Sequence, residues 1–162
     1  MSDDYDLQVL LELRENDKEE AEARYAEALQ ELQRRESYLE EKRRELEEAI
    51  EERKHQRRKL DDRRSCGEAS IAELRQFEAF ARGMKQQEQE LRETIDRAER
   101  ALVEQQERVE AAKEELADAT RELEAVERHR EEWEVEQERI ERRRKSSEMD
   151  DIAARIWREE QS

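Results

Sequence analysis

Two strict seven-residue repeats, separated by one short break at positions 65–68, run through most of this chain. The first repeat is mainly apolar and reads Leu11, Lys18, Tyr25, Leu32, Leu39, Leu46, Arg53 and Leu60. The second repeat is also mainly apolar and reads Leu74, Ala81, Glu88, Ile95, Leu102, Val109, Leu116 and Leu123. A strict seven-residue repeat keeps a narrow apolar seam on one side of an α-helix and favours a left-handed supercoil with a partner helix. We therefore expect an all-α chain that forms a long two-helix antiparallel coiled-coil hairpin.

The composition of the chain fits a seam better than a wide core. Of the 162 residues, 51% are charged and 33% are hydrophobic, whereas a globular domain is about half apolar and about a quarter charged. Such a composition is also typical of disordered chains and of single helices stabilised by Glu–Arg pairs four residues apart. Apolar residues held in phase over eight heptads argue against both, although the C-terminal third could form a single charge-stabilised helix.

The break in the repeats gives the expected element bounds within one domain over 1–162. The first helix is predicted at about 5–64, the turn at about 65–69 and the second helix at about 70–158. Gly67 ends the first helix after basic residues that suit its C-terminus, and Ser65, Glu68 and Ser70 are available to start the second. Gly83 lies inside the second helix, where it indicates either a close approach, a soft spot or a tolerated glycine.

The two predicted helices are unequal in length. At ~1.5 Å per residue, the first is ~90 Å long and the second could exceed ~110 Å. The numbers of facing residues add up either to 137, with Leu60 opposite Phe77, or to 130, with Arg53 opposite Phe77. The sequence does not choose between these registers. In both, we expect a C-terminal helical overhang in which nothing after about Arg130 has an intramolecular partner.

The overhang and the N-terminus both carry apolar residues beyond the needs of a two-stranded seam. Trp133 and Ile140 continue the seam, and a Ser-x-x-acid pattern at Ser147 predicts a helix start. Apolar residues then follow on one face at Met149, Ile152, Ala153, Ile156 and Trp157. The N-terminal surplus consists of Leu7, Val9, Leu10, Leu11 and Leu13. An apolar stripe without an internal partner predicts an external one; the alternative is a frayed or self-associating tail.

The charge of the chain argues against several classes of function. With a net charge of −16, we do not expect a nucleic-acid partner, because backbone recognition needs clustered cations. Two cationic clusters do occur: residues 53–64 hold seven Lys or Arg against two Asp, and residues 139–145 hold five against one Glu. We interpret both as solvated helix surface. We expect no membrane insertion, since no apolar run approaches ~20 residues. We also expect no signal peptide, because the N-terminus begins Met1-Ser2-Asp3-Asp4, without a basic region or an apolar stretch.

No pattern of residues predicts catalysis, a cofactor or a metal site. The chain has no glycine-rich phosphate loop, no Cys-x-x-Cys and no His-Glu-x-x-His. His55 and His129 are isolated and are expected to face solvent, and Cys66 is interpreted as a small turn residue in a reducing compartment. A solvated seam offers no pocket that excludes water. We therefore expect a cytoplasmic protein that is not an enzyme.

Three sequence blocks resemble a known family. Residues 5–15 (YDLQVLLELRE) resemble its opening, in which an aromatic residue precedes a Leu-Leu-x-Leu-Arg stretch. Residues 129–133 (HREEW) resemble a His-basic-x-x-Trp block, and residues 148–151 (EMDD) resemble an acidic block near the C-terminus. In this order and spacing they are similar to the FliJ/YscO proteins of type III secretion. The His-x-x-x-Trp block favours the injectisome (YscO) branch over the flagellar branch.

The resemblance implies a bacterial cytoplasmic stalk, peripheral to the inner-membrane export apparatus. It implies three partners: the hexameric export ATPase, the inner-membrane export gate protein and export chaperones. The end with both termini would dock in the ATPase, and the apolar residues there are Leu7, Leu10, Leu11, Trp133, Ile140, Ile152, Ile156 and Trp157. The tip, which is the end of the hairpin at the turn, would contact the gate. Its expected residues are Phe77, Phe80, Ala81 and Met84, of which Phe80 lies off the seam positions. The flagellar tyrosines of the first helix have no clear match.

Two functions therefore compete at this point. The first is a non-enzymatic central stalk of a type III protein export apparatus, which is expected to be monomeric. The second is a generic cytoplasmic coiled-coil scaffold or spacer, which would form a parallel homodimer along its length.

Overall fold

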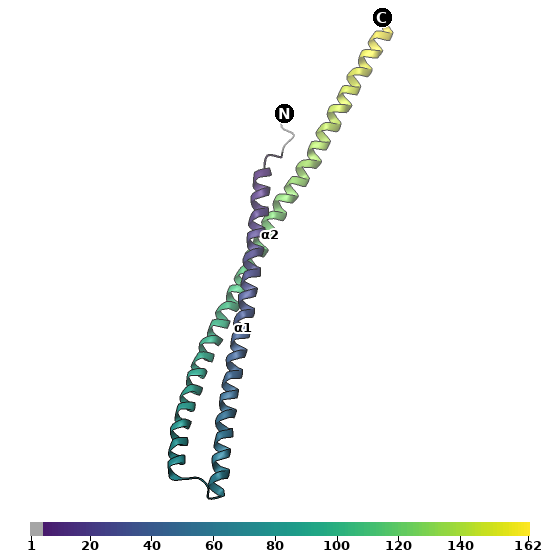
Figure 1. The fold of residues 1–162 in the computed structure, drawn as a ribbon. Helices are drawn as coiled ribbons and strands as arrows, with labels where there is room; N and C mark the ends of the chain where they lie inside the picture. Colours follow the sequence, from purple (N-terminus) through teal and green to yellow (C-terminus); the bar gives the residue numbers. More distant parts are fainter. Residues whose placement is uncertain (1–4) are drawn as a thin grey trace. The chain divides into compact units, whose positions relative to one another are not determined.

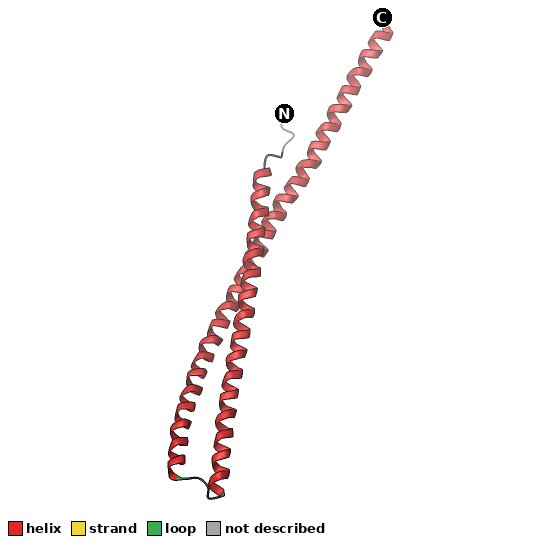
Figure 2. Cartoon of the chain, in the orientation of Figure 1, coloured by secondary structure: helices red, strands yellow, loops and turns green. Residues whose placement is uncertain are grey.

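Two long helices account for nearly all of residues 5–162, the part of the chain that the computed structural model describes (Figure 1). The helices are α1, Gln8–Ser65, and α2, Ile71–Gln161. They pack against each other, and the described residues contain no strand (Figure 2). The predicted all-α helical hairpin is therefore confirmed. Relative to the predicted bounds, α1 begins three residues later and α2 ends three residues later.

The helix start predicted at Ser147 is wrong, because α2 runs through this position without a break. Arg144 forms an ion pair with Glu141 at 2.8 Å, before Ser147, and another with Glu148 at 3.8 Å, which spans Ser147. Side chains three and four residues apart are neighbours on a helix surface. A Ser-x-x-acid pattern inside such a run of good helix formers therefore marks no boundary.

The contacts divide the hairpin into two compact units, each formed by a stretch of both helices. The first unit joins the residues up to Ala23 with Lys113–Ser162, and the second unit is Arg24–Ala112. In the second unit, the seam is built on Leu39, Ile95 and Ala98, with Leu46 and Leu102 packed against them. The a positions of the heptads thus supply the large apolar side chains, and small residues face them across the seam.

Polar side chains complete the seam of the second unit and fix its register. Gln105 donates a hydrogen bond to the carbonyl oxygen of Ala28 at 2.9 Å, and Arg35 donates one to the carbonyl oxygen of Ala101 at 2.7 Å. A helical carbonyl has a second lone pair, so it can accept such a bond without losing its own helical one. The numbers of Arg35 and Ala101 add up to 136, one below the predicted 137 register and six above the 130 register. Those of Gln105 and Ala28 add up to 133, which fits either register, so the Arg35 bond is the one that discriminates.

An ion pair lies inside the same seam, toward the turn. Glu88 is only 2% exposed, and its carboxylate accepts a hydrogen bond from Nε of Arg53 at 2.6 Å. The guanidinium of Arg53 keeps partial access to water, as expected of a long side chain lying over a seam. In the described part of the chain, no buried side-chain nitrogen or oxygen lacks a hydrogen-bond partner.

The first unit has a seam of its own in the same register. Leu11 is buried to 2% exposure and Ala21, Ala119 and Leu123 are also buried. Arg14 forms an ion pair with Glu122 at 2.9 Å across the seam, and these two numbers again add up to 136. The facing residues in each unit therefore follow the 137 register, one of the two registers that the sequence left open.

Gly67 ends α1 in a Schellman motif. Its φ of 72° lies in the left-handed region, which glycine adopts without steric cost. The amide of Gly67 donates to the carbonyl of Arg64 at 3.1 Å, and the amide of Glu68 donates to that of Arg63 at 2.9 Å. These two bonds satisfy carbonyls that the end of a helix leaves open. Gly83, in contrast, has open space where a Cβ would lie, so it is a tolerated glycine and not a point of close approach.

A capping box at Ser70 and Glu73 starts α2. The Ser70 hydroxyl accepts from the amide of Glu73 at 3.2 Å, and the Glu73 carboxylate accepts from the amide of Ser70 at 3.3 Å. The hydrogen bond from Arg63 first, and that from the Ser70 backbone second, lower the pKa of Glu73 below its ordinary value. Because the folded-state pKa is depressed, this stabilisation is present at neutral pH and is lost as the pH falls through that pKa.

The buried Arg53–Glu88 pair can be tested by exchanging its charges. We expect Glu88→Lys to lower the free energy of unfolding by about 3 kcal/mol, because it buries a second cation beside Arg53. The double variant Arg53→Glu/Glu88→Lys should recover most of this loss. Urea unfolding followed by far-UV circular dichroism measures both changes.

The exposed pair of Arg43 and Glu99, at 3.0 Å, is the matched control. Glu99→Lys should cost less than ~1 kcal/mol, since exposed ion pairs contribute little. If Glu88→Lys cost no more than Glu99→Lys, or if the charge exchange recovered nothing, the buried pair would not be part of the folded seam.

Candidate functional site

Tyr5, which lies three residues before the start of α1, packs on α2 and is 7% exposed. Its ring lies 5.4 Å from the Trp133 ring and 5.7 Å from the His129 ring, measured between centroids. Its hydroxyl oxygen lies 2.6 Å from Nδ1 of His129, within hydrogen-bond distance. We call these three residues the N-terminal aromatic cluster. It adds a final layer to the seam of the first unit, beyond the end of α1.

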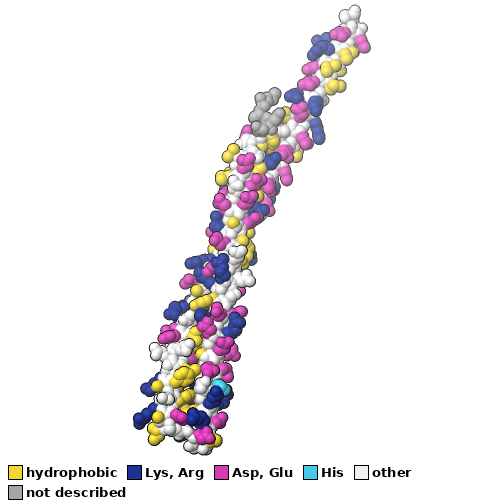
Figure 3. Space-filling model, viewed as in Figure 1, with side chains coloured by type: hydrophobic (Ala, Val, Ile, Leu, Met, Phe, Trp, Pro, Cys, Tyr) yellow, Lys and Arg dark blue, Asp and Glu magenta, His cyan; other side chains and the backbone are white. Residues whose placement is uncertain are grey.

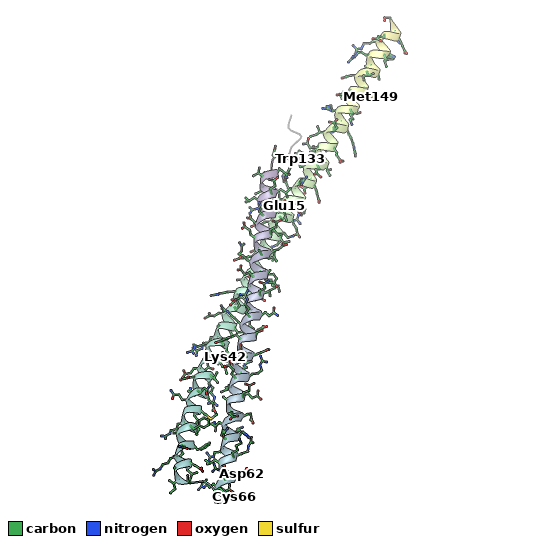
Figure 4. All side chains as sticks on the ribbon, viewed as in Figure 1. Glu15, Lys42, Asp62, Cys66, Trp133 and Met149 are labelled. Atoms are coloured by element: carbon green, nitrogen blue, oxygen red, sulfur yellow. The ribbon has the colours of Figure 1, made fainter. Side chains whose placement is uncertain are left out.

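This cluster corrects one expectation from the sequence and adds a contact to another. The expectation that nothing after about Arg130 has an intramolecular partner is wrong for Trp133, which packs against Tyr5. Figure 4 labels Trp133 beside the start of α1. His129 is exposed, as expected, but the sequence did not show that its Nδ1 also meets the Tyr5 hydroxyl. The spacing of His129 and Trp133, four residues apart, places both on one helix face, and this was the signal available in the sequence. His55 is exposed, as expected.

The apolar residues at the start of α1 differ in their exposure. Leu11 is buried in the seam, and Leu10 is half-buried. Leu7, Val9 and Leu13 are exposed. These N-terminal apolar residues therefore form two groups. Leu10 and Leu11 are at least half-buried, whereas Leu7, Val9 and Leu13 are left exposed by the hairpin.

The last part of α2 is exposed along nearly its whole length. From Glu134 to Gln161, every residue but Glu141 is exposed, and apolar side chains stand on this surface (Figure 3). The large ones are Val135, Ile140, Met149, Ile152, Ile156 and Trp157. Successive residues of an α-helix are ~100° apart, so Met149, Ile152 and Ile156 lie about 120–180° around α2 from Ile140. The overhang therefore has apolar residues on two opposite faces.

At the other end of the hairpin, the packing of the seam is open. Phe77, Ala81 and Met84 are half-buried, whereas Phe80 is 51% exposed, in line with its place off the seam. Leu60 and Phe77 line two grooves that flank the seam. The first, which we call the Arg57 groove, has a volume of about 420 Å³ and is lined by Arg57, Leu60, Asp61, Arg64, Leu74, Phe77, Glu78, Ala81, Arg82 and Lys85. The second, the Phe80 groove, is lined by Gln56, Lys59, Leu60, Arg63, Glu73, Gln76, Phe77 and Phe80.

The sequence-predicted tip residues are therefore divided between the two grooves. Phe77 lines both grooves, Ala81 lines only the Arg57 groove, and Phe80 lines only the Phe80 groove. Met84 belongs to the lining of neither. Cys66 is exposed in the turn (Figure 4). Residue spacing does not predict the grooves, because they depend on how loosely the two helices pack between the Arg53–Glu88 pair and the turn.

Neither end of the hairpin shows the residues of a metal site. Across residues 5–162, no group of three or more His, Cys, Asp or Glu side chains could hold a metal ion. None of the described helices has a stretch long and apolar enough to cross a membrane. What the described residues do present is exposed apolar surface at the ends of the hairpin, and such surface is typical of protein–protein contacts.

Comparison with known proteins agrees with this arrangement. No curated protein and no solved structure matches the chain. The model of one family, described as YscO-like protein, matches residues 2–162, and this family is associated with type III secretion. The match confirms the resemblance to the FliJ/YscO proteins, while the preference for the injectisome branch stays a prediction. Because the match covers almost the entire chain, the protein belongs to the YscO-like family.

Proposed function

We propose that this protein is the non-enzymatic central stalk of a type III protein export apparatus. In this role, the end with both termini docks in the hexameric export ATPase and the tip contacts the inner-membrane export gate. Family membership associates the protein with type III secretion. The observation that supports the stalk best is the overhang of α2, which carries large apolar residues and has no helix beside it to cover them.

The arrangement of the overhang favours a partner that surrounds it. Ile140 lies on one face of α2, and Met149, Ile152 and Ile156 lie on the opposite face. A single partner helix would cover one face and leave the other in water. The central opening of a ring-shaped hexamer can contact both faces at once. Each covered face gains about 25 cal/mol per Å² of apolar area, and Trp157, which is 62% exposed, is of the residue type most enriched in binding hot spots.

The seam itself favours the stalk over a generic dimeric scaffold. The a-position residues of α1 and α2, such as Leu11, Leu39 and Ile95, are buried within one chain. A parallel homodimer would need the same residues for its own interface. Since the hairpin already uses them, the surfaces left for partners are at its ends. We accordingly propose a monomeric, cytoplasmic protein, and the resemblance adds export chaperones as further partners.

Docking of the overhang in the ATPase predicts a loss of stimulation when its apolar face is removed. We expect the full chain to raise the turnover of the hexameric export ATPase. The triple variant Ile152→Ser/Ile156→Ser/Trp157→Ser should lose most of that stimulation, because polar side chains gain little from burial. The measurement is the steady-state rate of ATP hydrolysis by the export ATPase of the same secretion system.

This variant keeps the N-terminal aromatic cluster, so the hairpin seam is unchanged. Val103→Ser, which changes an exposed apolar residue of the second unit, is the matched control and should stimulate like the wild type. Equal stimulation by the triple variant and the wild type would show that the overhang does not dock in the ATPase.

Docking of the tip predicts that Phe80 contributes to binding of the export gate. Phe80→Ala should weaken binding of the gate's cytoplasmic domain by about tenfold or more, as expected for a truncated aromatic anchor, and should reduce secretion. Tyr38→Ala, at an aromatic residue of similar exposure on α1, is the control. Wild-type gate binding and wild-type secretion by Phe80→Ala would mean that Phe80 is not a contact residue.

A further inference from the structure

The tip of this acidic protein is locally basic. Residues 53–87 hold ten Lys or Arg and five Asp or Glu, a net charge of +5. Since the whole chain carries −16, the other 127 residues carry −21. Lys and Arg side chains gather around the turn in Figure 3. The sequence alone favoured a solvated surface for the cations at 53–64, but it did not show which of them share one groove.

Basic side chains from both helices meet at the Arg57 groove. Arg57 and Arg64 come from α1, and Arg82 and Lys85 come from α2. Arg57 is paired with Asp61 at 3.7 Å. Within residues 5–162, no carboxylate lies within 4.0 Å of the charged nitrogens of Arg64, Arg82 or Lys85. Three cations around one groove therefore have their charge available to a partner.

The floor of the same groove is apolar. Leu60, Leu74, Phe77 and Ala81 line it, and all four are only half-buried. The volume of about 420 Å³ lies within the range of ~300–1,000 Å³ that is typical of ligand pockets. An apolar floor with a basic rim is complementary to a segment that has apolar residues on one face and carboxylates beside them.

We propose that the Arg57 groove binds an acidic amphipathic helix of a partner protein. Leu or Phe side chains of that helix would enter the groove, and its Glu or Asp side chains would pair with Arg64, Arg82 and Lys85. This inference rests on the proposed function in one respect: the helix is taken to belong to the export gate protein. It adds the chemistry of the segment that the groove recognises.

An anionic membrane surface is the other partner that basic and apolar residues together can attract. The geometry favours a helix, because Leu60 and Phe77 are recessed between α1 and α2 and do not project from the tip. The tip also presents carboxylates outside the groove, at Asp62 and Glu68, which an anionic surface spread over the tip would repel.

The test is fluorescence anisotropy with the full chain and a labelled, designed amphipathic peptide of about five helical turns. The peptide has Leu and Phe on one face and Glu on the flanks, and a second peptide has every Glu replaced by Gln. We expect the acidic peptide to bind about tenfold or more tightly than its Gln counterpart, and its affinity to fall as salt rises, since salt screens exposed charges.

Variants of the chain locate the site. Arg82→Glu/Lys85→Glu should weaken binding of the acidic peptide by about tenfold or more, whereas Arg92→Glu/Arg108→Glu, the same change at exposed positions of α2 away from the groove, should leave it unchanged. Circular dichroism confirms that each variant is folded.

The results separate this inference from the gate contact. Overlapping peptides that cover the cytoplasmic domain of the gate protein provide the second probe. Binding of acidic gate segments, lost in Arg82→Glu/Lys85→Glu, would support both. Binding of the designed peptide but of no gate segment would support the groove and contradict the gate contact. Three results would overturn the inference. The Glu and Gln peptides could bind equally, or the Arg82→Glu/Lys85→Glu variant could bind the acidic peptide as tightly as the wild type. The third result is that the chain binds phosphatidylglycerol vesicles but not the peptide.

Discussion

Every other feature of this protein depends on the pairing of α1 with α2 along a narrow seam in each of the two units. A chain in which 51% of residues are charged has too few apolar residues for a wide core, so it places them in phase every seven residues. Leucines and alanines alone would fit nearly as well after a shift by one heptad. The polar groups inside the seam are specific to one register, because a shift to the 130 pairing would place Arg53 opposite Phe77 and move it away from Glu88. Buried polar residues that select a register are the best-attested use of such groups.

The seam also determines where the protein can meet partners. Because each helix covers the apolar stripe of the other, the middle of the hairpin presents mainly charged side chains. Apolar surface remains at the overhang, at the start of α1 and around the turn. These places differ in character. The overhang has apolar residues on two opposite faces of a single helix, which suits a partner that encloses it, whereas the tip has recessed apolar grooves with a basic rim, which suit an inserted helix.

Much of this architecture could be predicted from the sequence, because a long heptad repeat and a glycine are strong local signals. The two helices, the turn at Gly67, the seam residues Leu11 and Leu39 and the exposed position of Phe80 all follow from residue spacing. The register did not follow, since a seven-residue repeat looks the same after a shift of seven. The N-terminal aromatic cluster was missed for the same reason: only the correct register brings Tyr5 to His129 and Trp133. The supposed helix start at Ser147 failed because a short capping pattern carries little weight inside a long run of helix-forming residues.

The contacts at both ends of the hairpin depend on the register of the seam, and distances between spin labels test this register most directly. In a Cys66→Ser background, one label is placed at position 14 and a second at position 115, 122 or 129, all within the first unit. The ion pair between Arg14 and Glu122 predicts that the intramolecular distance is shortest for 122 and longer for both other positions, since seven residues advance a helix by ~10 Å. A minimum at 115 would contradict the register, and a short distance between two chains that are each labelled only at position 14 would contradict the hairpin itself.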